Sequence, residues 1–161
     1  MNRREFFSKS ALVVGGAAIA TALTQKPASA APRRNIVKSL KFGMVKAEAA
    51  DGRKLSIEER LQIALDAGFE SVEPNTINDA AELDQFKAAL GKLKIKVDAI
   101  ICDAHWRAPL SDADPAVFEQ TMQSMRTSFR NVKELGGDMV LLVPAVVNPA
   151  TMYRDAWTRS V

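Results

Sequence analysis

The chain has 161 residues, 47% of them hydrophobic and 25% charged, which is enough to fill the core of one domain of ordinary size. Four of the 22 basic residues and one of the 19 acidic residues lie in the first 30 positions, so the net charge of +3 comes from there. The neutral remainder argues against DNA or RNA as the main partner, because nucleic-acid binders carry basic patches that neutralise phosphates. The single cysteine, Cys102, excludes a disulfide within the chain and a multi-cysteine zinc site.

Residues 1–30 have the three parts of an export signal. A charged start containing Arg3 and Arg4 precedes an apolar stretch, residues 11–23, which is too short for an ordinary membrane span; a small-x-small site ending at Ala30 follows. The paired arginines before two phenylalanines resemble the bacterial twin-arginine motif. We expect cleavage near Ala30, contact with the membrane only during export, and a periplasmic or secreted mature protein. An uncleaved membrane anchor is the alternative.

Residues 39–161 are expected to form an α/β domain, after a short polar linker at residues 31–38. Stretches with strand-like patterning alternate with stretches of helical periodicity, in the order strand, helix, strand, helix, strand, helix, strand and the start of a helix. Each unit takes about 30 residues, the size of a βαβ step, so the sheet should be parallel with right-handed crossovers. Such a sheet needs cover on both faces.

The first strand is predicted from alternating apolar and polar or small residues over positions 40–44, and it should end near Lys46. A capping box follows at residues 56–59, where a serine and a glutamate satisfy each other's backbone donors. The first helix therefore begins directly after that serine. Gly68 supplies the left-handed residue that ends it.

The second strand covers residues 69–72 and closes on Glu73, because Pro74 cannot continue it. Asp79 is expected to cap the second helix. The apolar residues of that helix recur at spacings of three and four and predict one stripe that faces a core: Leu83, Phe86, Leu90 and Leu93.

A third strand is predicted at residues 97–101, which are rich in β-branched side chains. Asp114 caps the third helix, with Pro115 at its first position. The apolar residues of this helix should face the sheet: Phe118, Met122, Met125, Phe129 and Val132. A fourth strand covers residues 138–143, and a last helical turn begins at Asn148.

Polar residues follow the third strand directly: Cys102, Asp103, His105, Trp106 and Arg107. α/β proteins usually place their chemistry at the carboxyl ends of parallel strands, so His105, the only histidine, is a candidate binding residue. The open alternative is that His105 and Trp106 only cap and pack a surface loop. Glu73 ends the second strand, and its alternative role is to stabilise the start of the next helix. We expect Cys102 to be buried and unreactive.

Two segments stand out as motifs: Ala67-Gly-Phe-Glu-Ser-Val-Glu73 and Leu135-Gly-Gly-Asp-Met-Val-Leu-Leu-Val-Pro144. Together with residues 41–44, 55–61 and 101–109, they resemble the sugar phosphate isomerase/epimerase family, whose members have the xylose isomerase-like TIM barrel. Such barrels have eight βα units in about 250 residues, whereas this chain supplies about four strands. The resemblance therefore implies that residues 39–161 are the N-terminal half of a TIM barrel.

In this family a divalent metal (Mn, Mg, Co or Zn) assists removal of a proton next to the carbonyl of a sugar or sugar phosphate, because it stabilises the resulting enediolate. The glutamate, aspartate and histidine ligands come mainly from later strands, so the resemblance assigns no metal ligand and no catalytic residue to this chain. It implies that Glu73 and His105 face the substrate, with Asp103 and Trp106 as further candidates.

A half barrel leaves strand edges unpaired, so we expect this chain alone to be inactive and either to self-associate or to pair with a second barrel half. Other functions stay open. A non-catalytic carbohydrate-binding protein is one. A flavodoxin-like binding module is another, although the chain shows no glycine-rich phosphate loop. A metal-dependent endonuclease would need several histidines and a basic groove, whereas this chain has one histidine and no net charge after residue 30.

Overall fold

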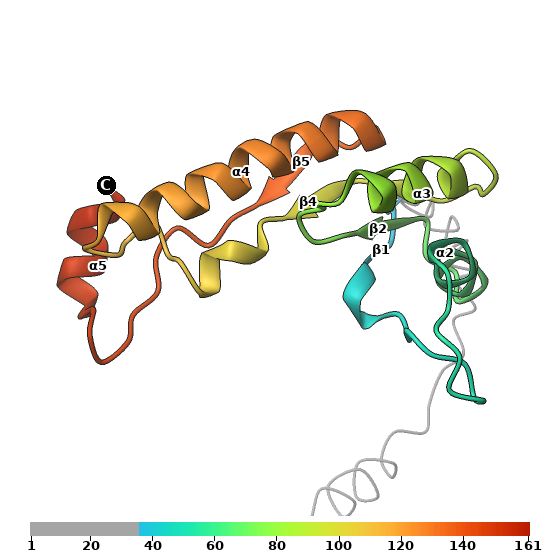
Figure 1. Ribbon diagram of the computed structural model, residues 1–161, viewed down its shortest axis with the longest axis horizontal. Helices are drawn as coiled ribbons and strands as arrows, with labels where there is room; N and C mark the ends of the chain where they lie inside the picture. The colour runs from blue at the N-terminus through green and yellow to red at the C-terminus, as the bar shows by residue number, and fades with distance from the viewer. Residues whose placement is uncertain (1–35) are drawn as a thin grey trace, which may run out of the picture. The chain divides into compact units, whose positions relative to one another are not determined.

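The computed structural model describes residues 36–161, which form an α/β unit of parallel strands and helices (Figure 1). The expected export signal, residues 1–30, and residues 31–35 of the expected linker lie outside the described residues. In chain order the elements are β1 (Ser39–Lys41), the 3-10 helix η1 (Phe42–Met44), α2 (Ile57–Asp66), β2 (Ser71–Glu73), α3 (Ala80–Leu90), β3 (Lys96–Val97), β4 (Ala99–Ile101), the 3-10 helix η2 (Asp103–Trp106), α4 (Pro115–Leu135), β5 (Met139–Leu141) and α5 (Tyr153–Ser160).

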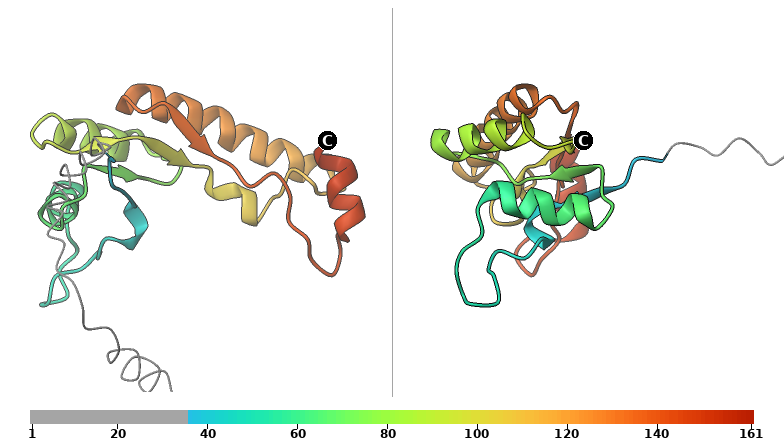
Figure 2. Two further views of the ribbon diagram at one scale, coloured as in Figure 1. Left: turned by 180° about the vertical axis from the view of Figure 1, so that it is seen from behind. Right: turned by 90° about the vertical axis from the view of Figure 1, so that its right-hand side faces the viewer.

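The described strands pair in parallel, as the sequence predicted. β1 pairs with β2, β2 with β3, and β4 with β5 (Figure 2). The expected third strand is interrupted at Asp98, which divides it into β3 and β4. Beyond that interruption the Ile101 N–H donates to Pro74 O at 2.8 Å, and Asn75 and Ile101 form a parallel bridge. The pairing therefore continues across the break and gives four strand positions, in the order β1, β2, β3 with β4, and β5.

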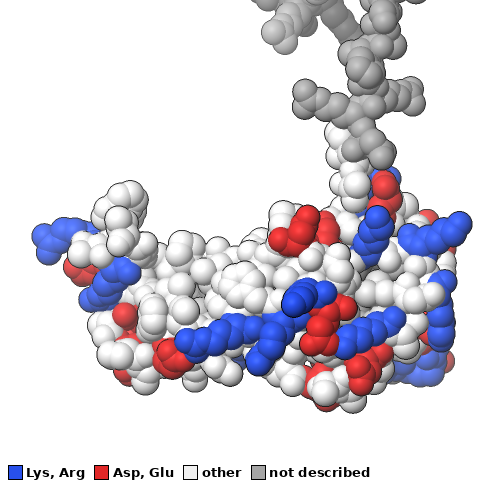
Figure 3. Space-filling model, turned by 90° about the horizontal axis from the view of Figure 1, so that it is seen from above, with Lys and Arg blue, Asp and Glu red and all other residues white. Residues whose placement is uncertain are grey.

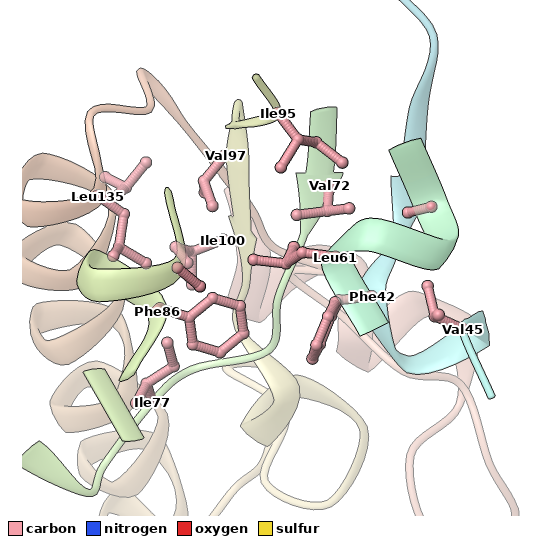
Figure 4. Packing of buried hydrophobic residues seen from close by; sticks show 13 residues of the cluster. Phe42, Val45, Leu61, Val72, Ile77, Phe86, Ile95, Val97, Ile100 and Leu135 are labelled. Carbon is pink, nitrogen blue, oxygen red and sulfur yellow. The ribbon is translucent and has the colours of Figure 1, made fainter. Parts of the chain in front are cut away.

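One hydrophobic core lies between the strands and helices α2, α3 and α4 (Figure 4). Val72 and Ile100 enter it from the strands, and Leu61 enters it from α2. Phe86 of α3 packs edge-on against Phe42, with 5.0 Å between the ring centroids. Phe86 is buried and the other three residues of its predicted stripe pack against the core, which confirms the expected core-facing side of α3.

The strand residues that alternate with the core residues form a second face, which we call the inner face of the sheet. It consists of Ser39, Lys41, Ser71, Glu73, Ala99, Ile101, Met139 and Leu141. Ala99 and Ile101 of β4 are buried, whereas both Met139 and Leu141 of β5 expose their side chains. The part of the sheet near β5 is therefore open on this face within residues 36–161.

The starts predicted for α2, α3 and α4 and the glycine predicted to end α2 are confirmed. Ser56 accepts from the backbone N–H of Glu59, whose carboxylate accepts from the backbone N–H of Ser56, and α2 begins at the next position. Gly68 follows that helix with a φ of 84°, the left-handed conformation that glycine adopts without strain. Asp79 and Asp114 cap α3 and α4 through their side chains.

The expected end of the first strand is wrong. β1 stops at Lys41, and the next three residues wind into η1 instead of continuing to Lys46. Phe42 lies in this turn and packs in the core beside Phe86. Arg60 of α2 holds the turn, because its Nη2 donates to the carbonyl oxygens of Phe42 and Val45 at 2.9 and 3.0 Å.

The sheet-facing stripe expected for the third helix is wrong in part. Val132 is buried, but the side chains of Phe118 and Phe129 are 42% and 56% exposed. The buried residues of α4 are mostly small or polar: Thr121, Ser128, Asn131, Val132 and Leu135. Polar residues occupy this face because they bind backbone groups of neighbouring loops; the Asn131 side chain, for example, accepts from the Ile77 N–H at 2.9 Å.

The last helix begins later than expected. Residues 148–151 form a turn in which the Asn148 side chain accepts from the backbone N–H groups of Ala150 and Thr151, both at 2.9 Å. A side chain that closes such a turn competes with helix formation, so α5 starts only at Tyr153. Among residues 36–161, no helix is long and apolar enough to cross a membrane.

Candidate functional site

The neighbouring strands β1 and β2 end in residues of opposite charge, Lys41 and Glu73. In the parallel pairing of these strands, Lys41 lies opposite Glu73. Since Leu40 and Val72 point into the core side, Lys41 and Glu73 point to the inner face. Within residues 36–161 neither side chain forms a hydrogen bond or an ion pair of 4.0 Å or less. Both are therefore available to a ligand at this end of the sheet.

His105 lies in η2, just beyond β4, and is 1% exposed. Its Nδ1 accepts a hydrogen bond from the backbone N–H of Val143, at 3.3 Å, and Val143 follows β5. The ring also packs edge-on against Trp106, with 5.1 Å between the centroids. His105 thus joins the segments that leave two neighbouring strands, which is a structural role whatever else it does.

The surroundings of His105 keep its imidazole neutral. Burial lowers the pKa of His105 below its ordinary value of 6.5; the negative charge of Asp103 acts in the opposite direction, and the positive charge of Lys41 lowers the pKa further. Because Nδ1 accepts from Val143, the neutral ring carries its proton on Nε2.

Asp103 and Trp106 are placed differently from Glu73. Asp103 lines a cavity of about 290 Å³ between η2 and α4, and its carboxylate lies 3.8 Å from the Arg107 guanidinium. Trp106 is 63% exposed. The four residues singled out by the sequence therefore do not form one cluster: Glu73 ends β2 on the inner face, His105 is buried beside the segment that follows β5, Asp103 lines the cavity beside α4, and Trp106 is exposed.

Lys41 was missed as a candidate from the sequence. The first strand was expected to run on to Lys46, which put its carboxyl end five residues too late. The alternation of Leu40, Lys41 and Phe42 fits a continuing strand, so the sequence carried no local signal for this end. The register of β1 against β2 then pairs Lys41 with Glu73. Cys102, in contrast, is buried as expected.

The side chains present do not by themselves form a metal site. Residues 36–161 contain no group of three or more histidine, cysteine, aspartate or glutamate side chains placed to hold a metal ion. The candidate donors, Glu73, Asp103 and His105, lie in different surroundings, and Nδ1 of His105 already accepts a hydrogen bond. We therefore derive no chemical step through a metal from these residues.

Comparison with known proteins identifies the architecture. No family model and no curated protein matches the sequence. A solved structure described as "Structure of L-ribulose 3-epimerase" matches with a TM-score of 0.55 and 22% sequence identity, over 77% of this chain and 41% of that chain. The fold is of TIM-barrel type. At this identity the likeness concerns the fold alone, and the chain spans less than half the length of the structure that it matches.

Proposed function

We propose that residues 39–161 supply the N-terminal half of a sugar isomerase/epimerase barrel, in which Glu73 and His105 contact a sugar or sugar phosphate. One observation carries the proposal: two charged side chains, Lys41 and Glu73, which have no partner within residues 36–161, stand at the carboxyl ends of parallel strands on the inner face of the sheet. This is the end at which TIM-barrel enzymes bind their substrates. The matching solved structure is that of an L-ribulose epimerase, which supports a sugar as the ligand.

The residues at this end suit a polar carbonyl substrate. Glu73 can accept hydrogen bonds from sugar hydroxyl groups, and Lys41 can neutralise a phosphate or polarise a carbonyl oxygen. Removal of a proton next to a carbonyl needs a base and a stabilised enediolate oxygen. The family resemblance assigns that stabilisation to a divalent metal, which would need ligands beyond the described residues.

A second barrel half is part of the proposal. Among the described strands, β1 and β5 each pair on one side only, and both inner-face residues of β5 are exposed. Unpaired edges and an open apolar face favour association with further strands. The partner is either a second barrel half or another copy of the chain. We expect the chain alone to turn over no ketose, even with added Mn²⁺; turnover above background by this chain would contradict the proposal.

Substrate contact is tested best by titrating the full chain with L-ribulose and following the ring signals of its one histidine by NMR. Saturable shifts of the His105 signals are expected. Glu73→Gln should weaken binding about tenfold, since a hydrogen bond to a charged group is lost. The matched control is Glu70→Gln, the same change at an exposed position before β2, at the other end of the strand. If His105 signals stay unchanged at all sugar concentrations, Glu73 and His105 do not bind this sugar.

We also propose export to the periplasm or the medium, a proposal based only on the sequence of residues 1–30. The N-terminal residue of the exported protein tests it. Ala31 is expected as the first residue, and a mature protein that begins at Met1 would contradict cleavage.

A further inference from the structure

A polar cavity of about 290 Å³ lies between η2 and the N-terminal half of α4, near the turn that precedes α3. Its polar lining includes Asn78, Asp103, Arg107, Gln120, Gln123 and Thr127. The volume is near the lower end of the range for small-molecule sites, about 300 Å³, and suits a ligand the size of a monosaccharide. Neither Glu73 nor His105 lines this cavity, so it is separate from the inner-face site.

The cavity wall on α4 is uncharged although the helix is rich in charges. Gln120, Gln123 and Thr127 recur at spacings of three and four and so share one stripe of the helix. The charged residues of α4 do not line the cavity: Glu119, Arg126, Arg130, Lys133 and Glu134. On the face seen from above, lysine and arginine side chains are interspersed with aspartate and glutamate side chains (Figure 3). The part of α4 that lines the cavity is therefore uncharged, and Arg130 lies close to it, because its Nη2 donates to the Thr127 hydroxyl at 3.1 Å.

Several polar groups of the cavity have unused hydrogen-bonding capacity. Within residues 36–161 the side-chain amides of Asn78, Gln120 and Gln123 form no hydrogen bond. Each amide offers two N–H donors and a carbonyl acceptor, the combination that matches a hydroxyl group, which both donates and accepts. Asp103 and Arg107 add a carboxylate and a guanidinium 3.8 Å apart. Because these two charges offset each other, the cavity favours a neutral ligand over an anion.

We propose that this cavity binds an uncharged polyhydroxylated ligand the size of a monosaccharide, at a site outside the inner face of the sheet. Three exposed amides around one cavity can exchange water for several hydroxyl groups of a ligand at once. An apolar ligand would displace that water without replacing its hydrogen bonds and is disfavoured for that reason. The inference stands on the cavity and its lining, and it does not require the catalytic function proposed for the inner face.

The test is an NMR titration of the full chain with xylitol, with D-fructose as a second probe. The side-chain amide signals of Gln120 and Gln123 should shift saturably. The double variant Gln120→Ala/Gln123→Ala should weaken binding at least about tenfold, because two hydrogen-bonding groups are lost. Gln85→Ala, the same change at an exposed position on α3, should leave binding unchanged.

Two results would overturn the inference: amide signals that do not respond to either polyol, or binding that Glu73→Gln weakens while the double variant does not. The second result would place the sugar at the inner face and support the function proposed there. Thermal unfolding of the double variant should match the wild type, since both glutamines are exposed. If it does not, Gln123→Asn, which shortens one amide and keeps its chemistry, provides the same comparison.

Discussion

The polar buried side of α4 gives the sharpest stability prediction. Asn131 is 3% exposed, and its side-chain oxygen accepts from the Ile77 N–H, the one hydrogen bond of that N–H among the described residues. Replacing Asn131 by alanine leaves this buried donor without a partner. An unsatisfied buried donor costs about 1–3 kcal/mol, so we expect the free energy of unfolding to fall by about 2 kcal/mol.

Urea unfolding of the full chain measures this loss. Asn131→Leu keeps the side-chain volume but not the acceptor and should lose about as much stability as Asn131→Ala. The control is Arg130→Ala at the adjacent exposed position, which should change stability by less than about 0.5 kcal/mol. If Asn131→Leu is as stable as the wild type, the polar face of α4 does not hold the loop after β2 by this hydrogen bond.

Three further predictions concern single positions. A hydrogen bond from Arg53, aided by those from Ser56, lowers the pKa of Glu59 from 4.5 to about 2. The ionised Glu59 therefore stabilises the fold above pH 4.5, and this stabilisation is lost towards pH 2. The urea midpoints of wild type and Glu59→Gln should converge over this range. Burial lowers the pKa of His105, so its stabilisation is lost as the pH falls below 6.5, and a ¹⁵N NMR midpoint above 6.5 would refute this. Gly137→Ala would place Cβ 2.9 Å from the Asp98 carbonyl oxygen and should cost about 1–3 kcal/mol in thermal unfolding experiments; an unchanged melting temperature would show that the backbone relaxes.

Local signals in the sequence predicted those parts of the fold that depend on neighbouring residues. The capping box before α2 and the left-handed Gly68 after it involve atoms only a few positions apart, so their residue types suffice. The parallel sheet followed from the spacing of the units. The alternation around Leu40 did not reveal that β1 ends at Lys41, because the following turn is held by Arg60, which donates to the carbonyl oxygen of Phe42 from 18 positions away in the chain.

The features that the sequence did not predict depend on contacts between segments far apart in the chain. Periodicity correctly predicted a long amphipathic α4. It also predicted that the apolar stripe faces the sheet, whereas in the structure the buried residues of this helix include Asn131 and Ser128. Hydrophobicity alone cannot show that an asparagine will meet an unpaired N–H from a loop 54 positions away. In the same way, His105 was found from its place after a strand, but its contact with Val143, 38 positions away, was not.

If residues 36–161 form half of a barrel, β5 is an open edge of the sheet. Met139 donates its N–H to Asp98 O, and Leu141 O accepts from the Cys102 N–H, so by alternation the N–H of Val140 points to the unpaired side. Amide hydrogen exchange of the full chain, at a concentration where it is monomeric, tests this directly. The Val140 N–H should exchange much faster than the Ile101 N–H, which donates to Pro74 O at 2.8 Å. Equal protection of the two amides in the monomer would contradict an open half barrel.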